Sequence, residues 1–237
     1  MFRYSGGMQQ QHYLCTSNER YWQQTLILKQ ILSILVAEED ESEQAVAVAG
    51  SAALHWCQDE HRIGPNKVEW TPRDLDLFIC CNERRYRERV HRMLRKLSEH
   101  QWHHKADTYL HMYGPTRRGV LITEVKLAGF RPILSLVQSP FADIPSTVAN
   151  FDIDVCRVAY FVKSNSFVLE GSTLEAIASG KATTRDFDLG GSCKETELIA
   201  SVIKSSIRRV AKYQKRGFEF TNFGKVMFAR RSRESSG

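Results

Sequence analysis

Long apolar stretches are missing from this chain. The apolar run near 25–28 is broken by Lys29 and Gln30, and no segment reaches the roughly 18 to 20 apolar residues of a membrane span. Residues 1–7 also lack the apolar region that follows the basic start of a secretory signal. We therefore expect no membrane partner and no secretion, and the sequence leaves import into an organelle open.

Cysteine is sparse as well. A disulfide scaffold would be denser in cysteine, whereas the six cysteines here are scattered and mostly lie in apolar surroundings. They are Cys15, Cys57, Cys80, Cys81, Cys156 and Cys193. We expect free thiols and a cytoplasmic or other reducing intracellular compartment.

Internal repeats and low-complexity blocks are also absent. The 237 residues are 42% hydrophobic and 25% charged, which is ordinary for a globular protein and excludes collagen, coiled coil and bulk disorder. Lys and Arg number 33 against 27 Asp and Glu, giving a formal net charge of +6. This excess permits a polyanionic partner but does not require one.

The apolar periodicity predicts alternating helices and strands. Helices are expected at 18–36, from 52, and at 83–100, 143–149, 173–178 and 194–216; strands at 45–49, 75–80, 120–127, 132–137 and 153–161. This order is typical of an α+β fold, with a mixed-sheet core, flanking helices and a helical C-terminal part. Asp143 or Pro145 is expected to begin the helix near 143, and Gly217 to follow the last helix.

Two aspartates alternate with apolar residues in the stretch 73–79. Strand side chains alternate between faces, so Asp74 and Asp76 should share one face while the leucines and isoleucine beside them enter the core. Neighbouring carboxylates repel unless a cation or water relieves them. Mg²⁺ prefers oxygen ligands and takes one or two carboxylates together with substrate phosphates.

The stretch 151–158 repeats this pattern with Asp152 and Asp154. If the strand expected at 153–161 extends through them, both aspartates share the face opposite the core. The alternative is that each stretch is an ordinary half-exposed strand with a polar outer face. A single pair of alternating aspartates would favour this ordinary strand, but the presence of two such pairs makes it a weaker explanation.

A third feature favours a binding site. An apolar strand at 46–49 enters Gly50 and Ser51, and a helix begins at once. Glycine lets the backbone approach a ligand closely, and the hydroxyl and free N–H groups of a helix start can hold phosphate oxygens.

This combination resembles the DNA polymerase β-like nucleotidyltransferase superfamily, over residues 46–161. Members carry a hydrophobic strand, a Gly-Ser or Gly-Gly, an acidic pair flanked by apolar residues, and a third acidic residue on a later strand. Here these are Gly50-Ser51, Asp74 with Asp76, and Asp152 or Asp154. The interval from Ser51 to Asp74 is longer than in many members, so 61–72 is interpreted as an insertion.

The segment 209–218 adds a second resemblance. It is similar to the R-x-x-K-Y-x-x-R-G-F segment of uncharacterised nucleotidyltransferase-like proteins of large viruses, fungi and protists. Those proteins also tend to have Phe-Asp at the third carboxylate, as Phe151-Asp152 does, which favours Asp152 over Asp154.

The resemblance implies a chemistry and a division of the chain. Mg²⁺ or Mn²⁺ would form a two-metal site on Asp74, Asp76 and Asp152, with a nucleoside triphosphate such as ATP as substrate. Gly50 and Ser51 would bind the β- and γ-phosphates, and Asp152 or Asp154 would help deprotonate the acceptor. Arg209 and Lys212 would offset the triphosphate charge.

The expected division of the chain has four parts. They are an N-terminal helical segment at 1–44, a nucleotidyltransferase-like catalytic core at 45–162, a helical part at 163–224 and a basic, disordered tail at 225–237. The acceptor stays open among an RNA 3′ end, a protein hydroxyl, a small molecule and another nucleotide.

Two other functions remain open at this point. The fold could serve as a catalytically inactive scaffold or interaction subunit of a larger assembly, including one that contains nucleic acid. The basic helices could instead bind RNA directly, which predicts salt-sensitive binding that does not depend on Asp74.

Overall fold

The computed structural model describes residues 2–5, 8–11, 19–37, 45–65, 70, 72–113, 118–128, 132–184 and 196–221. The helices are α1 (Glu19–Val36), α2 (Ser51–His61), α3 (Glu83–Glu99), α4 (Ile144–Ala149), α5 (Gly171–Ser179) and α6 (Thr196–Gln214), with a 3-10 helix at Asp154–Cys156. The strands are β1 (Phe2–Ser5), β2 (Met8–Gln11), β3 (Val46–Ala49), β4 (Asp74–Cys80), β5 (His104–Tyr113), β6 (Arg118–Leu127), β7 (Ile133–Ser139), β8 (Val158–Phe161), β9 (Ser166–Leu169), β10 (Lys181–Ala182) and β11 (Glu219–Phe220).

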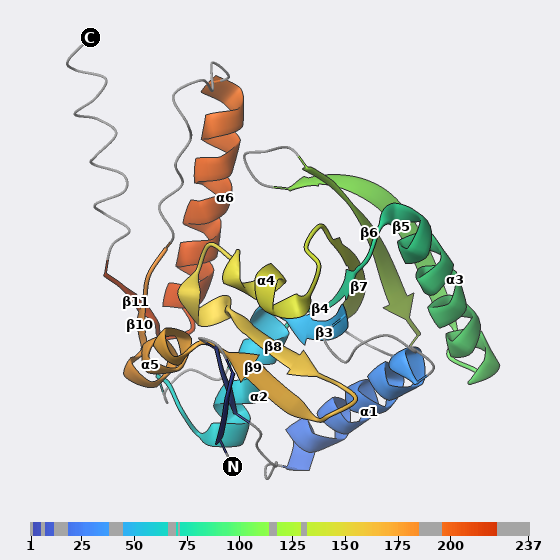
Figure 1. The fold of residues 1–237 in the computed structure, drawn as a ribbon, viewed down its shortest axis with the longest axis horizontal. Coiled ribbons are helices and arrows are strands. Elements are labelled where there is room, and N and C mark those ends of the chain that lie inside the picture. Colours follow the sequence, from blue (N-terminus) through green and yellow to red (C-terminus); the bar gives the residue numbers. More distant parts are fainter. Residues whose placement is uncertain are drawn as a thin grey trace.

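One mixed sheet organises the described part of the chain (Figure 1). Its nine strands run in the order β1-β2-β9-β8-β3-β4-β7-β6-β5, and β10 and β11 form a separate parallel pair. β4 and β7 are parallel neighbours, whereas every other neighbouring pair of the large sheet is antiparallel. This architecture confirms the α+β fold class.

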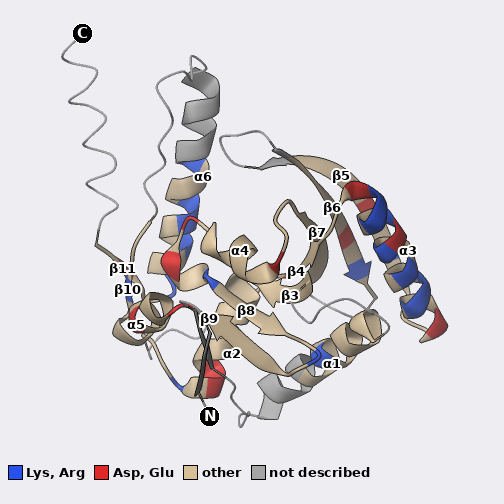
Figure 2. Ribbon diagram, in the orientation of Figure 1, with Lys and Arg blue, Asp and Glu red and all other residues tan. Residues whose placement is uncertain are grey.

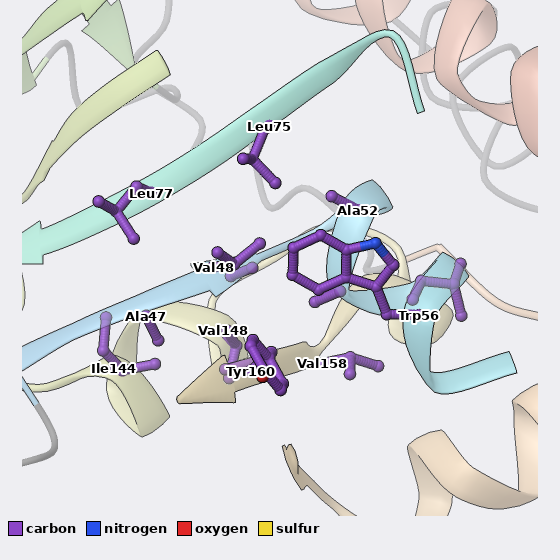
Figure 3. Close-up of a cluster of buried hydrophobic side chains, with 14 of the residues drawn as sticks. Ala47, Val48, Ala52, Trp56, Leu75, Leu77, Ile144, Val148, Val158 and Tyr160 are labelled. Atoms are coloured by element: carbon purple, nitrogen blue, oxygen red, sulfur yellow. The ribbon is translucent and has the colours of Figure 1, made fainter. Parts of the chain in front are cut away.

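The two faces of the sheet differ in what covers them. α3 packs on the face that carries Leu77, where the Tyr86 hydroxyl donates to the Leu136 carbonyl at 2.7 Å. α2 lies on the same face, and Trp56 packs edge to face on Tyr160 with ring centroids 5.3 Å apart (Figure 3). α4 contacts the opposite face, where Phe78 lies. Asp74 and Asp76 alternate with the core residues of β4, so they belong to the α4 face.

Both predicted helix boundaries are confirmed. The Asp143 side chain accepts from the Ser146 amide at 2.7 Å and so caps α4. Gly217 follows α6 with φ of 92°, and the Phe218 amide returns to the Tyr213 carbonyl at 3.1 Å. A Cβ on Gly217 would lie 2.9 Å from Pro65, so only glycine lets this end of α6 dock closely on the core.

The strand expected at 153–161 is wrong in its first half. Asp154 to Cys156 form a 3-10 helix, and the strand begins only at Val158. The Asp154 carboxylate accepts from the Val155 amide at 2.7 Å. Such a local side-chain bond to the backbone competes with a strand ladder. The alternation argument therefore does not apply to Asp152 and Asp154.

Six strands of the described residues have no counterpart in the sequence prediction: β1, β2, β5, β9, β10 and β11. β5 is exposed along 105–111, so it lacks the apolar alternation that marks a half-buried strand. β2 pairs with β9 and β9 with β8, so one sheet joins residues before 45 and after 163 to those between.

Some predictions lie outside the described residues or stay untested. The tail at 225–237 lies outside them, and the four-part division stays a prediction. The described cysteines, Cys57, Cys80, Cys81 and Cys156, are free thiols. Among the described helices, none combines the length and the apolar character that crossing a membrane requires.

Candidate functional site

A tight corner joins β3 to α2. Gly50 has φ of 74° and ψ of −136°, a backbone conformation that residues with a Cβ rarely adopt. Its amide donates to the Val158 carbonyl at 3.3 Å, and its carbonyl accepts from the Leu54 amide at 2.9 Å, which closes the first turn of α2. Ser51 is the first residue of that helix and is buried. The corner therefore presents a helix N-terminus with no side chain at its apex.

The acidic pair begins the strand beside this corner. Asp76 lies opposite Ala49 of β3 in the antiparallel register, and the Ser51 hydroxyl lies 3.4 Å from the Asp74 carboxylate, to which it donates. The predicted alternation on β4 is confirmed, because Leu75 and Leu77 are buried while both aspartates are partly exposed. The structure thus brings the Gly50–Ser51 corner and the acidic pair together.

Asp76 is electrostatically strained. Burial and, second, the neighbouring Asp74 charge raise the pKa of Asp76 to about 7. A hydrogen bond from Ser135 and the positive charge of Lys212 oppose that rise. A further positive charge placed between the two carboxylates would relieve this strain.

Phe151, the neighbour of Asp152, packs at the corner. A Cβ on Gly50 would lie 3.8 Å from the Phe151 ring, and that ring packs on Phe78 with centroids 5.5 Å apart. The Arg209 guanidinium engages both Asp152 oxygens: Nη1 donates to Oδ1 at 2.9 Å, and Nη2 lies 2.8 Å from Oδ2. Burial raises the pKa of Asp152, and the Arg209 charge opposes the rise.

Asp154 has different partners from Asp152. Its Oδ1 accepts from the Val155 amide at 2.7 Å and the Thr183 amide at 2.9 Å, and its Oδ2 accepts from the Thr183 hydroxyl at 2.7 Å. These bonds tie the 3-10 helix to the segment that follows β10. Both Asp154 oxygens are engaged in local structure, which supports Asp152 as the aspartate that belongs to the site.

The C-terminal half of α6 supplies the cations (Figure 2). Lys212 Nζ lies 3.9 Å from Asp74 Oδ1, and Arg209, one turn earlier, holds Asp152. Arg216 is buried and stacks on Trp70, with its guanidinium carbon 3.6 Å from the ring centroid, and on Tyr213 at 4.7 Å. Arg209 and Lys212 therefore face the carboxylates, whereas Arg216 anchors the helix.

The acidic pair offers carboxylate oxygens that could hold a divalent cation. Within the described stretches, no group of three or more His, Cys, Asp and Glu side chains is arranged to hold a metal ion. Asp74 and Asp76 would supply two oxygen ligands, and substrate phosphates the rest, which is the usual pattern for Mg²⁺. Asp152 is turned to Arg209 instead.

Two polar residues near the acidic pair are not marked by any motif in the sequence. Ser135 of β7 lies opposite Asp76 in the parallel register and hydrogen-bonds it. Glu124 of β6 lies opposite Ser135 in turn. Their positions depend on strand order, which a single sequence without a motif does not reveal.

These contacts define an α+β protein with a paired-carboxylate site at the start of β4, faced by two cations of α6. The chain belongs to the Gabija anti-defense 2 (Gad2) family, whose model matches residues 24–180, about two thirds of the length. The matched range contains the Gly50–Ser51 corner and all four aspartates, and it ends before α6.

The other comparisons add little. None of the curated proteins matches the chain. Among solved structures, it is similar to a tRNA-processing enzyme in an apo form, with 11% identity and a TM-score of 0.42. The likeness covers 71% of this chain and only 37% of that enzyme's chain. At that TM-score it bears on neither activity nor substrate.

Proposed function

We propose that the chain is a metal-dependent nucleotidyltransferase, which moves a nucleoside monophosphate from a nucleoside triphosphate to a hydroxyl acceptor. The observation that carries this proposal is the junction of the Gly50–Ser51 corner with the acidic pair, where the Ser51 hydroxyl lies 3.4 Å from Asp74. This contact supports the proposal because the polymerase β-like resemblance implies a phosphate-binding corner next to a metal-binding pair.

The corner suits the β- and γ-phosphates. The N-terminal N–H groups of α2 lack helical partners, and the helix dipole favours negative charge there. Gly50 presents no Cβ toward a ligand, and Ser51 adds a hydroxyl. Lys212, near Asp74, would offset part of the triphosphate charge.

The acidic pair suits a divalent cation such as Mg²⁺ or Mn²⁺. When bound, the cation would act as a Lewis acid on the phosphoryl oxygens. Asp74 and Asp76 would hold it, and the cation would lower the electrostatic cost that raises the pKa of Asp76. Ser135 would keep Asp76 oriented through its hydrogen bond.

The reaction is an in-line displacement at the α-phosphorus. The acceptor oxygen forms a bond to that phosphorus, and the bond from the phosphorus to the α,β-bridging oxygen breaks. Pyrophosphate leaves with the electron pair, and the acceptor proton passes to a neighbouring carboxylate or to water. The acceptor stays open among an RNA 3′ end, a protein hydroxyl, a small molecule and another nucleotide. Membership of the Gabija anti-defense 2 family supports a role for this transfer in countering that defence.

One observation favours a second candidate, an inactive scaffold or interaction subunit. Arg209 forms an ion pair with Asp152, the expected third carboxylate: it hydrogen-bonds Oδ1 and lies 2.8 Å from Oδ2. A site that has lost its chemistry would tolerate such an internal ion pair permanently. The scaffold predicts no metal-dependent binding of nucleoside triphosphates.

Transfer of label separates the two candidates. The protein is incubated with each α-³²P nucleoside triphosphate, Mn²⁺, and total RNA or protein extract. Nucleotidyl transfer predicts labelled acceptor from the wild type and none from Asp74→Asn/Asp76→Asn. Asp107→Asn is the matched control, because Asp107 is an exposed carboxylate on β5, in register with Glu124. Equal labelling by the wild type and the Asp74/Asp76 double variant would refute the site.

A further inference from the structure

Asp152 and Asp76 differ in the partners that their environment provides. Arg209 reaches both oxygens of Asp152 within 2.9 Å, and that carboxylate side chain is only 13% exposed. The hydrogen bond from Nη1 to Oδ1 is charge-assisted and therefore strong, and Nη2 lies close to Oδ2. A metal ion could bind Asp152 only by displacing the Arg209 guanidinium. Because the Asp152 carboxylate is largely buried, breaking this ion pair would be costly.

Asp74 is open by comparison, and Asp76 beside it is less exposed. The Asp74 side chain is 44% exposed, and its contacts with Ser51 at 3.4 Å and Lys212 at 3.9 Å are both long. Nothing in the described part of the chain grips Asp74 or Asp76 through both oxygens. A divalent cation can therefore enter between them without breaking a strong contact.

Arg209 keeps donors to spare. A guanidinium has five N–H groups, and the engagement of Asp152 leaves a second N–H on each terminal nitrogen. The Arg209 side chain is 38% exposed, so it remains accessible from one side. Lys212 lies three residues further along α6, hence on the same helix face, and approaches Asp74. The two cations therefore share one face of α6, with Lys212 near Asp74 and Arg209 at Asp152.

We propose that this centre takes one divalent cation, on Asp74 and Asp76, and that Asp152 is a positioning residue that aims Arg209 at the phosphates of the bound nucleotide. Arg209 then supplies the positive charge that a second metal ion supplies in a two-metal site. This inference rests on the proposed nucleotidyltransferase function and revises its expected metal count.

Counting bound Mn²⁺ tests the inference without any turnover. Free Mn²⁺ is measured by electron paramagnetic resonance as it is titrated into the protein, alone and with a saturating α,β-methylene nucleoside triphosphate that cannot be cleaved, and the Mn²⁺ that the same nucleotide binds without protein is subtracted. One ion per chain is expected in both cases. Asp152→Asn should leave Mn²⁺ affinity without nucleotide within twofold of the wild type, and weaken nucleotide affinity about tenfold.

Variants of Arg209 distinguish two roles for Asp152, that of a residue that positions Arg209 and that of a metal ligand masked by Arg209. If Asp152 positions Arg209, Arg209→Lys and Asp152→Asn each weaken nucleotide binding, and the double variant is no worse than either single variant, because they act as one unit. If Asp152 were a metal ligand masked by Arg209, Arg209→Ala would free it, and Mn²⁺ would bind more tightly or with a second ion. Thermal melts confirm that each variant is folded.

The outcomes distinguish this inference from the proposed function. Two Mn²⁺ per wild-type chain with nucleotide, falling to one in Asp152→Asn, would overturn the single-ion site and leave the transferase intact. Absence of Mn²⁺ binding that depends on Asp74 and Asp76 would overturn both. Asp107→Asn should match the wild type in every titration.

Discussion

The Ser51 hydroxyl donates to the Asp74 carboxylate across 3.4 Å, and this contact joins the start of α2 to the start of β4. The two residues are 23 positions apart in the chain. Their meeting places a helix N-terminus, which favours anions, beside a pair of carboxylates, which favours cations. A metal–nucleotide complex carries both kinds of charge, which is why the two features together point to nucleotide chemistry.

Neutralising the acidic pair should stabilise the protein when no metal is present. Asp74→Asn/Asp76→Asn removes a like-charge pair and the cost of burying the Asp76 charge, so the free energy of unfolding at pH 8 in EDTA should rise by roughly 1 to 3 kcal/mol. Urea unfolding measures this change. Asp107→Asn on the exposed part of β5 should change it by less than about 0.5 kcal/mol. A double variant less stable than the wild type would contradict the assignment of strain to this pair.

Replacing the corner glycine should destabilise the fold through its backbone. Gly50→Ala places a Cβ at φ of 74°, and we expect a loss of about 1 to 3 kcal/mol in the free energy of unfolding. The new methyl group would meet only the Phe151 ring, at an ordinary 3.8 Å, so crowding is not the cause. Ser51→Ala is the neighbouring control, with unstrained backbone. Unchanged unfolding midpoints for Gly50→Ala would show that the corner is less constrained than described.

Substitutions of Asp152 and Asp154, the two aspartates after α4, should differ in their effects on stability and on nucleotide binding. Asp154→Ala removes the acceptor of the Val155 amide, the Thr183 amide and the Thr183 hydroxyl, and should cost about 1 to 3 kcal/mol of stability while nucleotide binding survives. Asp152→Asn should weaken nucleotide binding while changing stability less. Urea unfolding and nucleotide titration of the same preparations measure both quantities. The reverse pattern would make Asp154 the site residue.

His55 should make the stability of the fold decrease as the pH falls from about 6.5 toward 4, whereas the raised pKa of Asp76 acts in the opposite direction over much of this range. Burial, with a smaller contribution from Arg216, lowers the pKa of His55 to about 4 in the folded state, against 6.5 for an exposed histidine. Between these values the unfolded chain binds the proton and the folded chain does not, so acidification favours unfolding by up to about 3 kcal/mol. The ring packs edge to face on Trp70 with centroids 4.6 Å apart.

A pH series of urea unfolding curves checks this contribution. His55→Gln should reduce the slope of stability against pH between 4 and 6.5, with little change above pH 7. His61 also has a lowered pKa through burial, and the raised pKa of Asp76 contributes a slope of the opposite sign, so the comparison is made between the wild type and the His55 variant at each pH. An unaltered slope in the His55 variant would show that its folded-state pKa is ordinary.

The sequence predicts the local parts of the site and misses the long-range ones. The period-two pattern of β4 is confirmed because one face of the strand is buried, which separates Leu75 and Leu77 from Asp74 and Asp76. Gly50 is marked by the abrupt change from an apolar strand to a helix. The pairing of Arg209 with Asp152 spans 57 positions, and no local pattern encodes it.

Two errors of the secondary-structure prediction have identifiable physical causes. Asp154 bonds its own neighbouring backbone and Thr183, so the expected strand becomes a 3-10 helix in its first half. β5 is exposed along most of its length, so its hydrogen bonds to β6, rather than an apolar face, hold it in the sheet. Ser135 is placed beside Asp76 by the parallel pairing of β4 and β7, which the sequence does not specify.

The most direct test of the central claim is a thermal-shift screen of the four nucleoside triphosphates, each with and without Mg²⁺ or Mn²⁺. A ligand that binds only the folded state raises its stability by mass action, by about 2.7 kcal/mol at a hundredfold excess over Kd. We predict a rise in Tm that requires both metal and triphosphate and vanishes in Asp74→Asn/Asp76→Asn. No rise with any combination, from well-folded protein, would contradict the nucleotidyltransferase and favour the scaffold.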